Sequence, residues 1–458
     1  MTPDERGVSW KILLPVGPES RICAIGLDEG GLAGLTRSYG MVDTQPVDGL
    51  KYDIVIIGDG GCDDLYDWCN LIPRIVPDGV VVNASRRCFA KKLKDAGYSC
   101  LRRYAALPPG EPKLFIPLAS KKLRAGGLAF HSPGSLRARI GLTFAKALSC
   151  LGMQSHLARS VVSLYAKSKE AFDRQSLIQW LSEKLGYPVV DLTVYTGSDL
   201  SRRKITVLAI AEDGYADVVV KIADTIEGAD AIRQESNALQ AIAAFSLSEQ
   251  APKLIAKGQW YGYSVQLQKQ VIGGSCRQVA RLTESHLEFL SKLSTIGRKI
   301  MRLKAARMWR DVKAKAEVIS LEALSPPIRV ALETILSDRF ADMPVVCHRT
   351  HGDFTPWNIK VSNGKLFVYD WEESLSDGLA LTDIFRFIYR QASLVGPWPG
   401  AQKVLMDMRS ISRSFSDTAG YETIETDVIL TVWLLYEYFA KPSDYLGDML
   451  DAVLRNSR

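Results

Sequence analysis

The first part of the chain alternates short, continuous apolar runs with segments in which apolar residues recur every three or four positions. Short continuous runs predict buried strands, and the wider spacing predicts helices. The predicted strands cover residues 21–26, 52–58, 80–82 and 114–118, and the predicted helices cover residues 65–72 and 89–97. Strands that alternate with helices predict a parallel sheet, so we expect an α/β, Rossmann-like domain over residues 1–118.

A second pattern begins after residue 170. Residues 176–185 predict an amphipathic helix, which precedes strand-like runs at residues 189–195, 204–211, 217–223 and 265–271 and a helix at about residues 229–245. From about residue 275 the apolar spacing is mostly helical, including a basic segment at residues 298–315. We therefore expect an antiparallel small lobe over residues 171–270 and a helical large lobe over residues 271–458.

The stretch HRTHGDFTPWNIKVSNGKLFVYDWEE, residues 348–373, interrupts the helical pattern. Apolar residues flank a lysine over residues 359–361, the Asn-Gly pair at 363–364 is a two-residue turn that favours hairpins, and an apolar strand returns. The two arms are about equally long. The predicted hairpin therefore brings Asp370, at the end of the second arm, beside Asn358, at the start of the first.

Three polar side chains of this stretch have the chemistry that phosphoryl transfer from ATP requires. Asp353 is a carboxylate that could accept the proton of an attacking hydroxyl group, and Asn358 and Asp370 offer oxygen ligands for Mg²⁺. Protein kinases also place the metal-binding asparagine five residues after the base aspartate. The alternative is a surface hairpin with incidental acids, but the complete order of these groups favours the catalytic interpretation.

Around these residues the sequence resembles the aminoglycoside phosphotransferase and choline kinase-like family. The HGDF sequence at residues 351–354, followed by Asn358, is similar to the family's catalytic-loop motif, and the DWE sequence at residues 370–372 is similar to its metal motif. The resemblance covers roughly residues 175–458. It implies a bilobal, α+β, protein-kinase-like phosphotransferase fold with ATP and Mg²⁺ as cofactors. It also implies supporting roles for His351, Glu372 and Asp383.

In the small lobe, Lys221 lies inside the apolar run VVVKIA. It is either an edge residue that faces water or the lysine that holds the α and β phosphates of ATP, and the downstream catalytic stretch favours the second role. Glu235 shares a helix face with apolar residues, so it needs a partner, and Lys221 is the obvious one. Glu227 is the alternative if the helix register differs.

Two further ATP-binding segments are predicted from their place in the small lobe. Gly197 and Ser198, at the first turn, would cover the phosphates, although the turn is poorer in glycine than the loop of protein kinases. The strand that leads to Gly273-Gly274 fits the hinge that binds adenine through backbone groups. Within that strand, the adenine contacts are expected near Gln268 and Gln270.

The first domain resembles the later half of a Rossmann-type methyltransferase. YDIVIIGDGG and IVPDGVVV stand where that family has its fourth and fifth strands. The first turn departs from the family pattern, because residues 26–31 read GLDEGG and carry acids where S-adenosylmethionine would place its carboxylate. Asp43 is the only candidate for a ribose-binding acid. We expect a truncated, methyltransferase-like domain without methyltransferase activity.

Residues 119–170 predict a basic helical connector, because residues 119–169 hold nine basic residues and no acid. Its apolar residues, at about helical spacing, either pack on a neighbouring domain or lie on an anionic membrane surface, and we favour packing. No nucleic-acid-binding motif accompanies the charge, so no nucleic-acid partner is expected. No apolar run reaches the length of a membrane span, and the eight cysteines form no C-x-x-C pair. These features predict a cytoplasmic protein, with peripheral binding at the inner face of the membrane as the alternative.

The sequence therefore predicts a kinase that phosphorylates a hydroxyl group of a sugar, an amino alcohol or an aminoglycoside-like acceptor. Two alternatives stay open. The first is a catalytically degenerate ATP-binding scaffold. The second is a bifunctional methyltransferase-kinase that acts on a glycan precursor.

Overall fold

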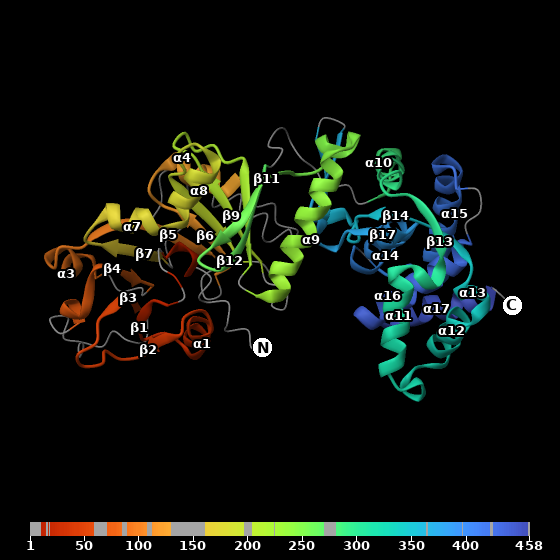
Figure 1. The fold of residues 1–458 in the computed structure, drawn as a ribbon, viewed down its shortest axis with the longest axis horizontal. Helices are drawn as coiled ribbons and strands as arrows, with labels where there is room; N and C mark the ends of the chain where they lie inside the picture. Colours follow the sequence, from red (N-terminus) through yellow and green to blue (C-terminus); the bar gives the residue numbers. More distant parts are fainter. Residues whose placement is uncertain are drawn as a thin grey trace. The chain divides into compact units, whose positions relative to one another are not determined.

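The computed structural model describes residues 11–14, 17, 19–58, 71–84, 89–107, 112–129, 161–196, 204–223, 225–269, 281–362, 365–395, 397–421 and 425–456. The chain forms two compact units. Unit 1 comprises residues 1–232 and 254–271, and unit 2 comprises residues 233–253 and 272–458. Figure 1 labels most of the helices and strands of both units.

Unit 1 is built on one twelve-stranded sheet with the order β11-β12-β10-β9-β8-β6-β5-β7-β4-β3-β1-β2. The strands are β1 (Arg21–Ile25), β2 (Met41–Asp43), β3 (Tyr52–Ile57), β4 (Ile75–Asn83), β5 (Ser99–Leu107), β6 (Leu114–Pro117), β7 (Val161–Ala166), β8 (Asp191–Tyr195), β9 (Lys204–Ile210), β10 (Val218–Ala223), β11 (Lys253–Trp260) and β12 (Tyr263–Lys269). The four predicted small-lobe strands and the four predicted strands of the first domain are all present.

The pairing of the strands changes from parallel to antiparallel along the sheet. β1 pairs in parallel with β2 and β3, and β3 pairs in parallel with β4. β7 then pairs antiparallel with β4 and β5, and β5 pairs antiparallel with β6. The prediction of a parallel sheet over residues 1–118 is therefore right for β1 to β4 and wrong for β5 and β6. β5 has no parallel neighbour because β7, from the predicted connector, runs between β4 and β5, and β6 is reversed because it pairs antiparallel with β5.

The first domain and the small lobe are hydrogen-bonded to each other through β6 and β8. Leu114 lies opposite Tyr195, and Phe115 lies opposite Val194. One core cluster extends along the sheet on both sides of this junction and includes Ile22 and Leu267. The first domain and the small lobe therefore share this cluster, while smaller clusters belong to one region or the other.

Short helices cover the faces of this sheet. They are α1 (Glu29–Ser38), α3 (Ala90–Asp95), α4 (Lys121–Ala129), α7 (Lys169–Gln175) and α8 (Leu177–Leu185). α8 confirms the predicted helix at 176–185, because Ser176 caps its first turn and Gly186, at φ 74°, ends it. Most of the predicted helix at 65–72 lies outside the described residues.

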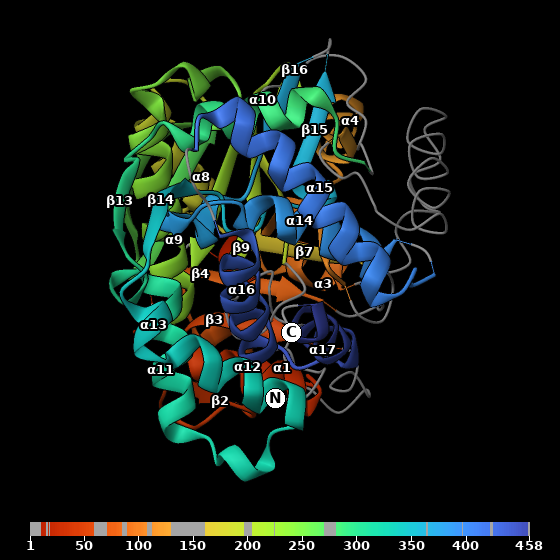
Figure 2. The same cartoon turned by 90° about the vertical axis from the view of Figure 1, so that its right-hand side faces the viewer.

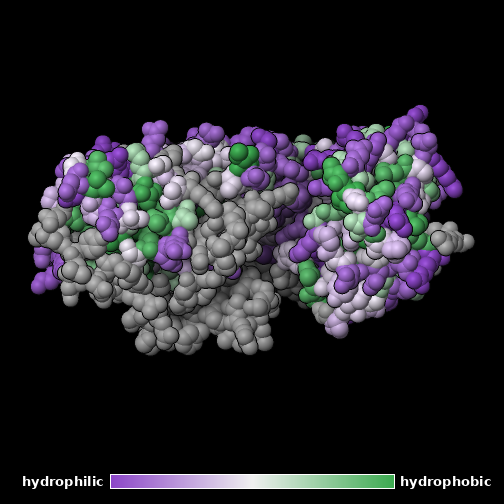
Figure 3. Space-filling model, turned by 90° about the horizontal axis from the view of Figure 1, so that it is seen from below, coloured by the Kyte–Doolittle hydropathy of each residue, from purple (hydrophilic) through white to green (hydrophobic). Residues whose placement is uncertain are grey.

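The described part of the connector contains one helix, α4, and one interior strand, β7. Arg124, one of its basic residues, is buried and donates a hydrogen bond from Nη1 to the Leu118 carbonyl at 2.9 Å. Residues 130–160, which include its most regular apolar pattern, lie outside the described residues. None of the described helices is long and apolar enough to span a membrane. The face drawn in Figure 3 mixes hydrophilic and hydrophobic side chains over both units.

Unit 2 is mostly helical, as predicted (Figure 2). Its helices are the end of α9 (Ile226–Ala243), α10 (Glu284–Ser294), α11 (Arg307–Val318), α12 (Pro326–Leu336), α13 (Asp338–Ala341), α14 (Thr382–Leu394), α15 (Ala401–Ala419), α16 (Thr426–Ala440) and α17 (Asp444–Asn456). α16 is a core helix, because residues 428–435 are all buried.

Unit 2 also contains a three-stranded sheet and a two-stranded sheet. β14 (Pro344–Thr350) lies between β13 (Lys299–Arg302) and β17 (Leu375–Leu379), and β15 (Ile359–Ser362) pairs with β16 (Lys365–Val368). The basic segment at 298–315 is not one helix as expected. Its first part is β13, which pairs with β14, and α11 begins only at Arg307.

Candidate active site

The loop that follows β14 bends sharply at Gly352. Gly352 has φ +82°, a conformation that side chains rarely adopt. An added Cβ would lie 2.0 Å from the Glu373 carbonyl oxygen, so only glycine fits between the loop and the chain that follows the hairpin. This bend turns the chain away from β14 and leads it to Asp353.

Asp383, at the start of α14, fixes the same bend. Its carboxylate accepts hydrogen bonds from the backbone N–H groups of His351 at 2.7 Å and Gly352 at 2.9 Å. Asp383 is buried, and carboxylates that accept backbone N–H groups form strong, charge-assisted bonds. The carboxylate therefore holds two successive amides of the loop, which agrees with the supporting role expected for Asp383.

The His351 ring joins the loop to the end of the hairpin. Its Nδ1 accepts from the Asp353 backbone N–H at 3.2 Å, so the proton of the neutral ring lies on Nε2. Nε2 then donates to the Tyr369 carbonyl at 2.8 Å. The fully buried ring also packs on Trp371, with 4.5 Å between the ring centroids. His351 is therefore a buried bridge within the site.

Asn358 holds the carboxylate of Asp353. The Asn358 side-chain nitrogen donates to Asp353 Oδ2 at 2.8 Å and to the Asp353 carbonyl at 3.0 Å. These bonds occupy the amide nitrogen, so the amide oxygen is the part of Asn358 that is suited to a cation. The other carboxylate oxygen of Asp353, Oδ1, lies on the side of the Arg386 guanidinium.

The hairpin brings Asp370 next to Asn358, as its equal arms predict. β15 and β16 are in register from Ile359 opposite Val368, and the Tyr369 backbone N–H donates to the Asn358 carbonyl at 2.8 Å. Asp370, the next residue, has φ 63° and ψ 66°, which is the left-handed region. The turn at 363–364 lies outside the described residues.

Glu235 contacts this end of the hairpin from α9. Its Oε1 accepts a hydrogen bond from the Trp371 backbone N–H at 3.3 Å, and the side chain is fully buried. Gln234, the preceding residue, donates to the Ser374 carbonyl at 2.9 Å. The buried carboxylate expected on the inward face of this helix is therefore present. Glu372, in the 3₁₀ turn after Asp370, is half-buried.

The donor set around Asn358 and Asp370 fits a nucleotide-bound Mg²⁺. Among the described residues, no group of three or more His, Cys, Asp or Glu side chains could hold a metal by itself. Mg²⁺ is commonly bound by one or two carboxylates together with substrate phosphates, so it needs no all-protein cage. An amide oxygen and a carboxylate on adjacent hairpin arms meet that requirement.

A cluster of aromatic side chains packs against Phe354 and Trp371, the residues that follow Asp353 and Asp370. Phe354 stacks on Phe289 of α10 with 5.8 Å between centroids, and Phe289 also contacts Trp371 at 6.2 Å. His286 packs edge-on against Phe354 at 6.1 Å. Burial lowers the pKa of His286 to about 4, so this ring is neutral in the core. The residues that follow Asp353 and Asp370 in sequence thus share one apolar support.

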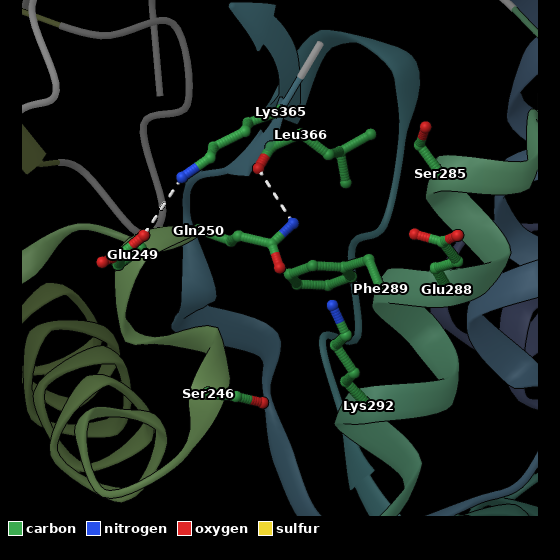
Figure 4. A pocket seen from close by; sticks show the side chains of 9 residues that line it. All are labelled: Ser246, Glu249, Gln250, Ser285, Glu288, Phe289, Lys292, Lys365 and Leu366. Atoms are coloured by element: carbon green, nitrogen blue, oxygen red, sulfur yellow. Dashed lines mark hydrogen bonds and ion pairs between the residues drawn. The ribbon is translucent and has the colours of Figure 1, made fainter.

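A cavity of about 260 Å³ lies in unit 2, with Phe289 as part of its lining (Figure 4). It is lined by Ser246, Glu249, Gln250, Ser285, Glu288, Phe289, Lys292, Lys365 and Leu366. Gln250 donates to the Leu366 carbonyl at 3.2 Å, and Lys365 pairs with Glu249 at 3.2 Å. No predicted site residue is among those that line this cavity, although Phe289 also stacks on Phe354.

The predicted ATP-binding residues of the small lobe belong to unit 1, except Glu235, which belongs to unit 2. Lys221 lies on β10, opposite Thr206 of β9 and Gln266 of β12. β10 is an interior strand, so the alternative that Lys221 is an edge residue is wrong. Gln268 lies on β12 and is buried. Gly197, Ser198 and Gln270 lie outside the described residues.

The predicted pair of Lys221 and Glu235 stays a prediction. The two residues belong to different units, and each unit is described by itself.

Sequence reasoning missed a cluster of three charged residues, of which one, Arg386, lies next to Asp353. Arg386 and Arg390, on α14, both contact the buried Glu437 of α16, and Arg386 also lies 3.8 Å from Asp353. Arg386 and Glu437 are 51 positions apart, so no local pattern could have paired them. The sequence shows Arg386 three positions after Asp383, but no residue near it in the sequence indicates that its partner is Glu437.

Comparison with protein families identifies the segment that carries this loop. Residues 197–402 match the phosphotransferase enzyme family, APH. The phosphotransferase segment includes Lys221, the whole stretch from 348 to 373 and Asp383. It excludes the first domain, and no comparison supports the expected resemblance of that domain to methyltransferases. Comparison with curated proteins found no match.

Solved structures of small-molecule kinases resemble part of this chain at low identity. Choline kinase from Streptococcus pneumoniae is 13% identical, with 60% of this chain and 97% of that chain covered and a TM-score of 0.38. Plasmodium vivax ethanolamine kinase is 12% identical, with 64% and 89% covered and a TM-score of 0.36. An aminoglycoside phosphotransferase from Streptomyces rimosus, in complex with ADP and streptomycin, is 14% identical, with 53% and 91% covered and a TM-score of 0.31.

Proposed function

We propose that this protein is an ATP- and Mg²⁺-dependent kinase that transfers the γ-phosphoryl group of ATP to a hydroxyl group of a small molecule. The observation that carries the proposal is the hydrogen bond of 2.8 Å between Asn358 and Asp353. This bond orients a carboxylate and an amide on one loop within a segment that matches a phosphotransferase family. The acceptor is a sugar, an amino alcohol or an aminoglycoside-like compound.

Asp353 is the proposed general base. Asn358 occupies its Oδ2, so Oδ1 is the oxygen that accepts the proton of the acceptor hydroxyl. The loop geometry supports this role, because Asp383 and His351 hold the backbone on both sides of Gly352. A base held in this way has little conformational freedom to lose when the acceptor binds.

Asn358 and Asp370 are the proposed Mg²⁺ ligands. The bound ion would neutralise charge on the phosphate oxygens during transfer. Tyr369 supports this assignment, because its hydrogen bond to Asn358 keeps the two ligand-bearing positions together. In the small lobe, Lys221 would hold the α and β phosphates and Glu235 would orient it. Gly197 and Ser198 would cover the phosphates, and the strand near Gln268 and Gln270 would bind adenine.

The test begins with binding and continues with turnover. ATP with Mg²⁺ should raise the thermal midpoint of the protein, and ADP release should then appear with one acceptor in a panel of sugars, amino alcohols and aminoglycosides. Asp353→Asn should lower turnover by roughly a hundredfold or more while the midpoint shift with ATP and Mg²⁺ persists. Asp370→Asn should remove the Mg²⁺-dependent part of that shift.

Asp407→Asn is the matched control, because Asp407 is an exposed aspartate that pairs with Lys403 on α15. It should leave both binding and turnover unchanged. A midpoint shift without turnover of any acceptor would favour the degenerate scaffold. Equal turnover in the wild-type protein and the Asp353→Asn variant would refute the assignment of the base.

A further inference from the structure

Glu437 is a buried carboxylate that contacts two arginines. Arg386 and Arg390 lie one turn apart on α14, and each contacts a different oxygen of Glu437 on α16. Arg386 Nη2 is in close contact with Oε1, and Arg390 Nη2 lies 3.4 Å from Oε2. The Glu437 side chain is 5% exposed, so water contributes little to its solvation. Both of its oxygens are therefore used to hold α14.

The other terminal nitrogen of Arg386 faces the proposed base. Nη1 lies 3.8 Å from Asp353 Oδ1, which is longer than a hydrogen bond. The Arg386 guanidinium thus contacts Glu437 closely and Asp353 only loosely. The gap between Nη1 and Oδ1 lies at the oxygen that Asn358 leaves for an acceptor hydroxyl.

Arg386 stays charged in this buried position. Burial alone would lower the pKa of its guanidinium, but the carboxylates of Glu437, Asp353 and Asp383 outweigh burial and raise that pKa above its usual value. A buried guanidinium without a carboxylate partner is unfavourable by several kcal/mol. If Glu437 lost its charge, Asp353 would be the carboxylate already in position to replace it.

We propose that Glu437 is a positioning residue that holds Arg386 away from Asp353, so that Oδ1 of Asp353 keeps room for the acceptor. The competition of two carboxylates for one guanidinium follows from the contacts alone. Its effect on catalysis rests on the proposed function, in which Asp353 is the base.

The competition predicts that the stability effects of Glu437 and Asp353 depend on each other. Asp353→Asn should shift the thermal midpoint of unit 2 by less than about 1 °C in the otherwise unchanged protein. In the Glu437→Gln protein the same substitution should lower it by about 4 °C or more, because Arg386 then loses the second of the two carboxylates that it pairs with. Hydrogen exchange of peptides from α14 and α16 during heating reports this midpoint.

Two controls isolate Arg386 as the connection. In an Arg386→Met background the coupling between positions 353 and 437 should disappear. Asp427→Asn removes a different carboxylate of α16, which pairs with Arg409 at 2.8 Å, and its effect should add to that of Asp353→Asn. Additive effects of Glu437→Gln and Asp353→Asn, or coupling that persists in the Arg386→Met background, would overturn the proposal.

The catalytic consequence is measured with the acceptor found in the ADP-release panel. Glu437→Gln should lower kcat roughly tenfold or more and leave the KM for ATP unchanged. Glu437→Asp should retain more activity than Glu437→Gln, and Arg386→Met in the Glu437→Gln background should restore part of the lost kcat. An unchanged kcat in Glu437→Gln would overturn the catalytic role. If no acceptor reacts, the proposed function fails, and the stability coupling still decides the competition.

Discussion

Each unit contains a buried arginine between two carboxylates. In unit 1 the arginine lies closer to the more exposed carboxylate, and in unit 2 it lies closer to the more buried one. In unit 1, Arg102 of β5 lies 3.1 Å from Asp173 and 3.7 Å from Asp191. In unit 2, Arg386 is close to Glu437 and 3.8 Å from Asp353. The exposures are nearly the same, because the more buried carboxylate is 5% exposed and the other 28% exposed in both clusters.

The difference lies in the other bonds of the carboxylates. Asp191 Oδ1 accepts from the Tyr104 hydroxyl at 2.6 Å and from the Leu192 backbone N–H at 2.9 Å, and Arg102 also donates to the Val190 carbonyl at 2.7 Å. These bonds connect β5 to the start of β8, so the cluster in unit 1 stabilises the sheet. In unit 2, Asp353 is 28% exposed, and its Oδ1 lies 3.8 Å from Arg386 Nη1, which is longer than a hydrogen bond. The same pair of charges therefore joins strands in unit 1 and, in unit 2, leaves the more exposed carboxylate only loosely paired.

Loss of Arg102 should have the largest effect on stability. Arg102→Met leaves Asp191 buried without its cation, which should lower the free energy of unfolding of unit 1 by about 3–5 kcal/mol. Urea titration, followed by hydrogen exchange of β5 and β8 peptides, measures this loss. Adding Asp191→Asn should restore part of the stability, since it removes the unpaired charge. A loss below about 1 kcal/mol would contradict the structural role of this cluster.

His286 in unit 2 and Asp191 in unit 1 should contribute pH dependences of opposite sign to the stability of their units. Burial lowers the pKa of His286 from 6.5 to about 4, so the unfolded chain binds its proton more readily. The contribution of His286 to the stability of unit 2 is complete above pH 6.5. It falls by up to about 1.4 kcal/mol per pH unit as the pH drops toward 4.

In unit 1, burial raises the pKa of Asp191, and Arg102 and Tyr104 only partly oppose it. The folded state therefore binds the Asp191 proton more readily, and the stability from this group is present at low pH and is lost as the pH rises above 3.8. Unfolding measured against pH for wild type, His286→Gln and Asp191→Asn separates the two slopes. Parallel pH profiles for wild type and both variants would refute these assignments.

An exposed ion pair should have the smallest effect. Lys365 and Glu249 lie 3.2 Å apart, but their side chains are 75% and 78% solvent-exposed. Lys365→Met should change the free energy of unfolding by less than about 0.5 kcal/mol. Urea titration at low and high salt checks this, and a loss close to that of Arg102→Met would show that burial is not what distinguishes these pairs.

Local spacing predicted the parts of the site that lie close together in the sequence. The equal arms of the hairpin were enough to bring Asn358 beside Asp370, because register in a short hairpin follows from its turn. Burial of Glu235 followed from its helix face. The strands with continuous apolar runs, such as β3, were also found from sequence alone.

Contacts between distant residues could not be predicted in this way. β5 was missed because its sequence, SCLRRYAAL, carries charges, and the residue that pairs with Arg102 at 3.1 Å is 71 positions away. The same limit hid the contact of Arg386 with Glu437. The predicted parallel sheet failed at β5 because β7 enters the sheet from beyond residue 160, where the spacing indicated helices.

The bonding of β6 to β8 has a consequence for how the phosphotransferase segment can be produced. A chain shortened to begin near residue 171 would lack β6, and the outer edge of β8 would offer its backbone groups to other molecules. We expect such a fragment to precipitate during expression, whereas the full chain stays dispersed. Residues 1–118, through β6, would then keep the edge of β8 from pairing with other molecules.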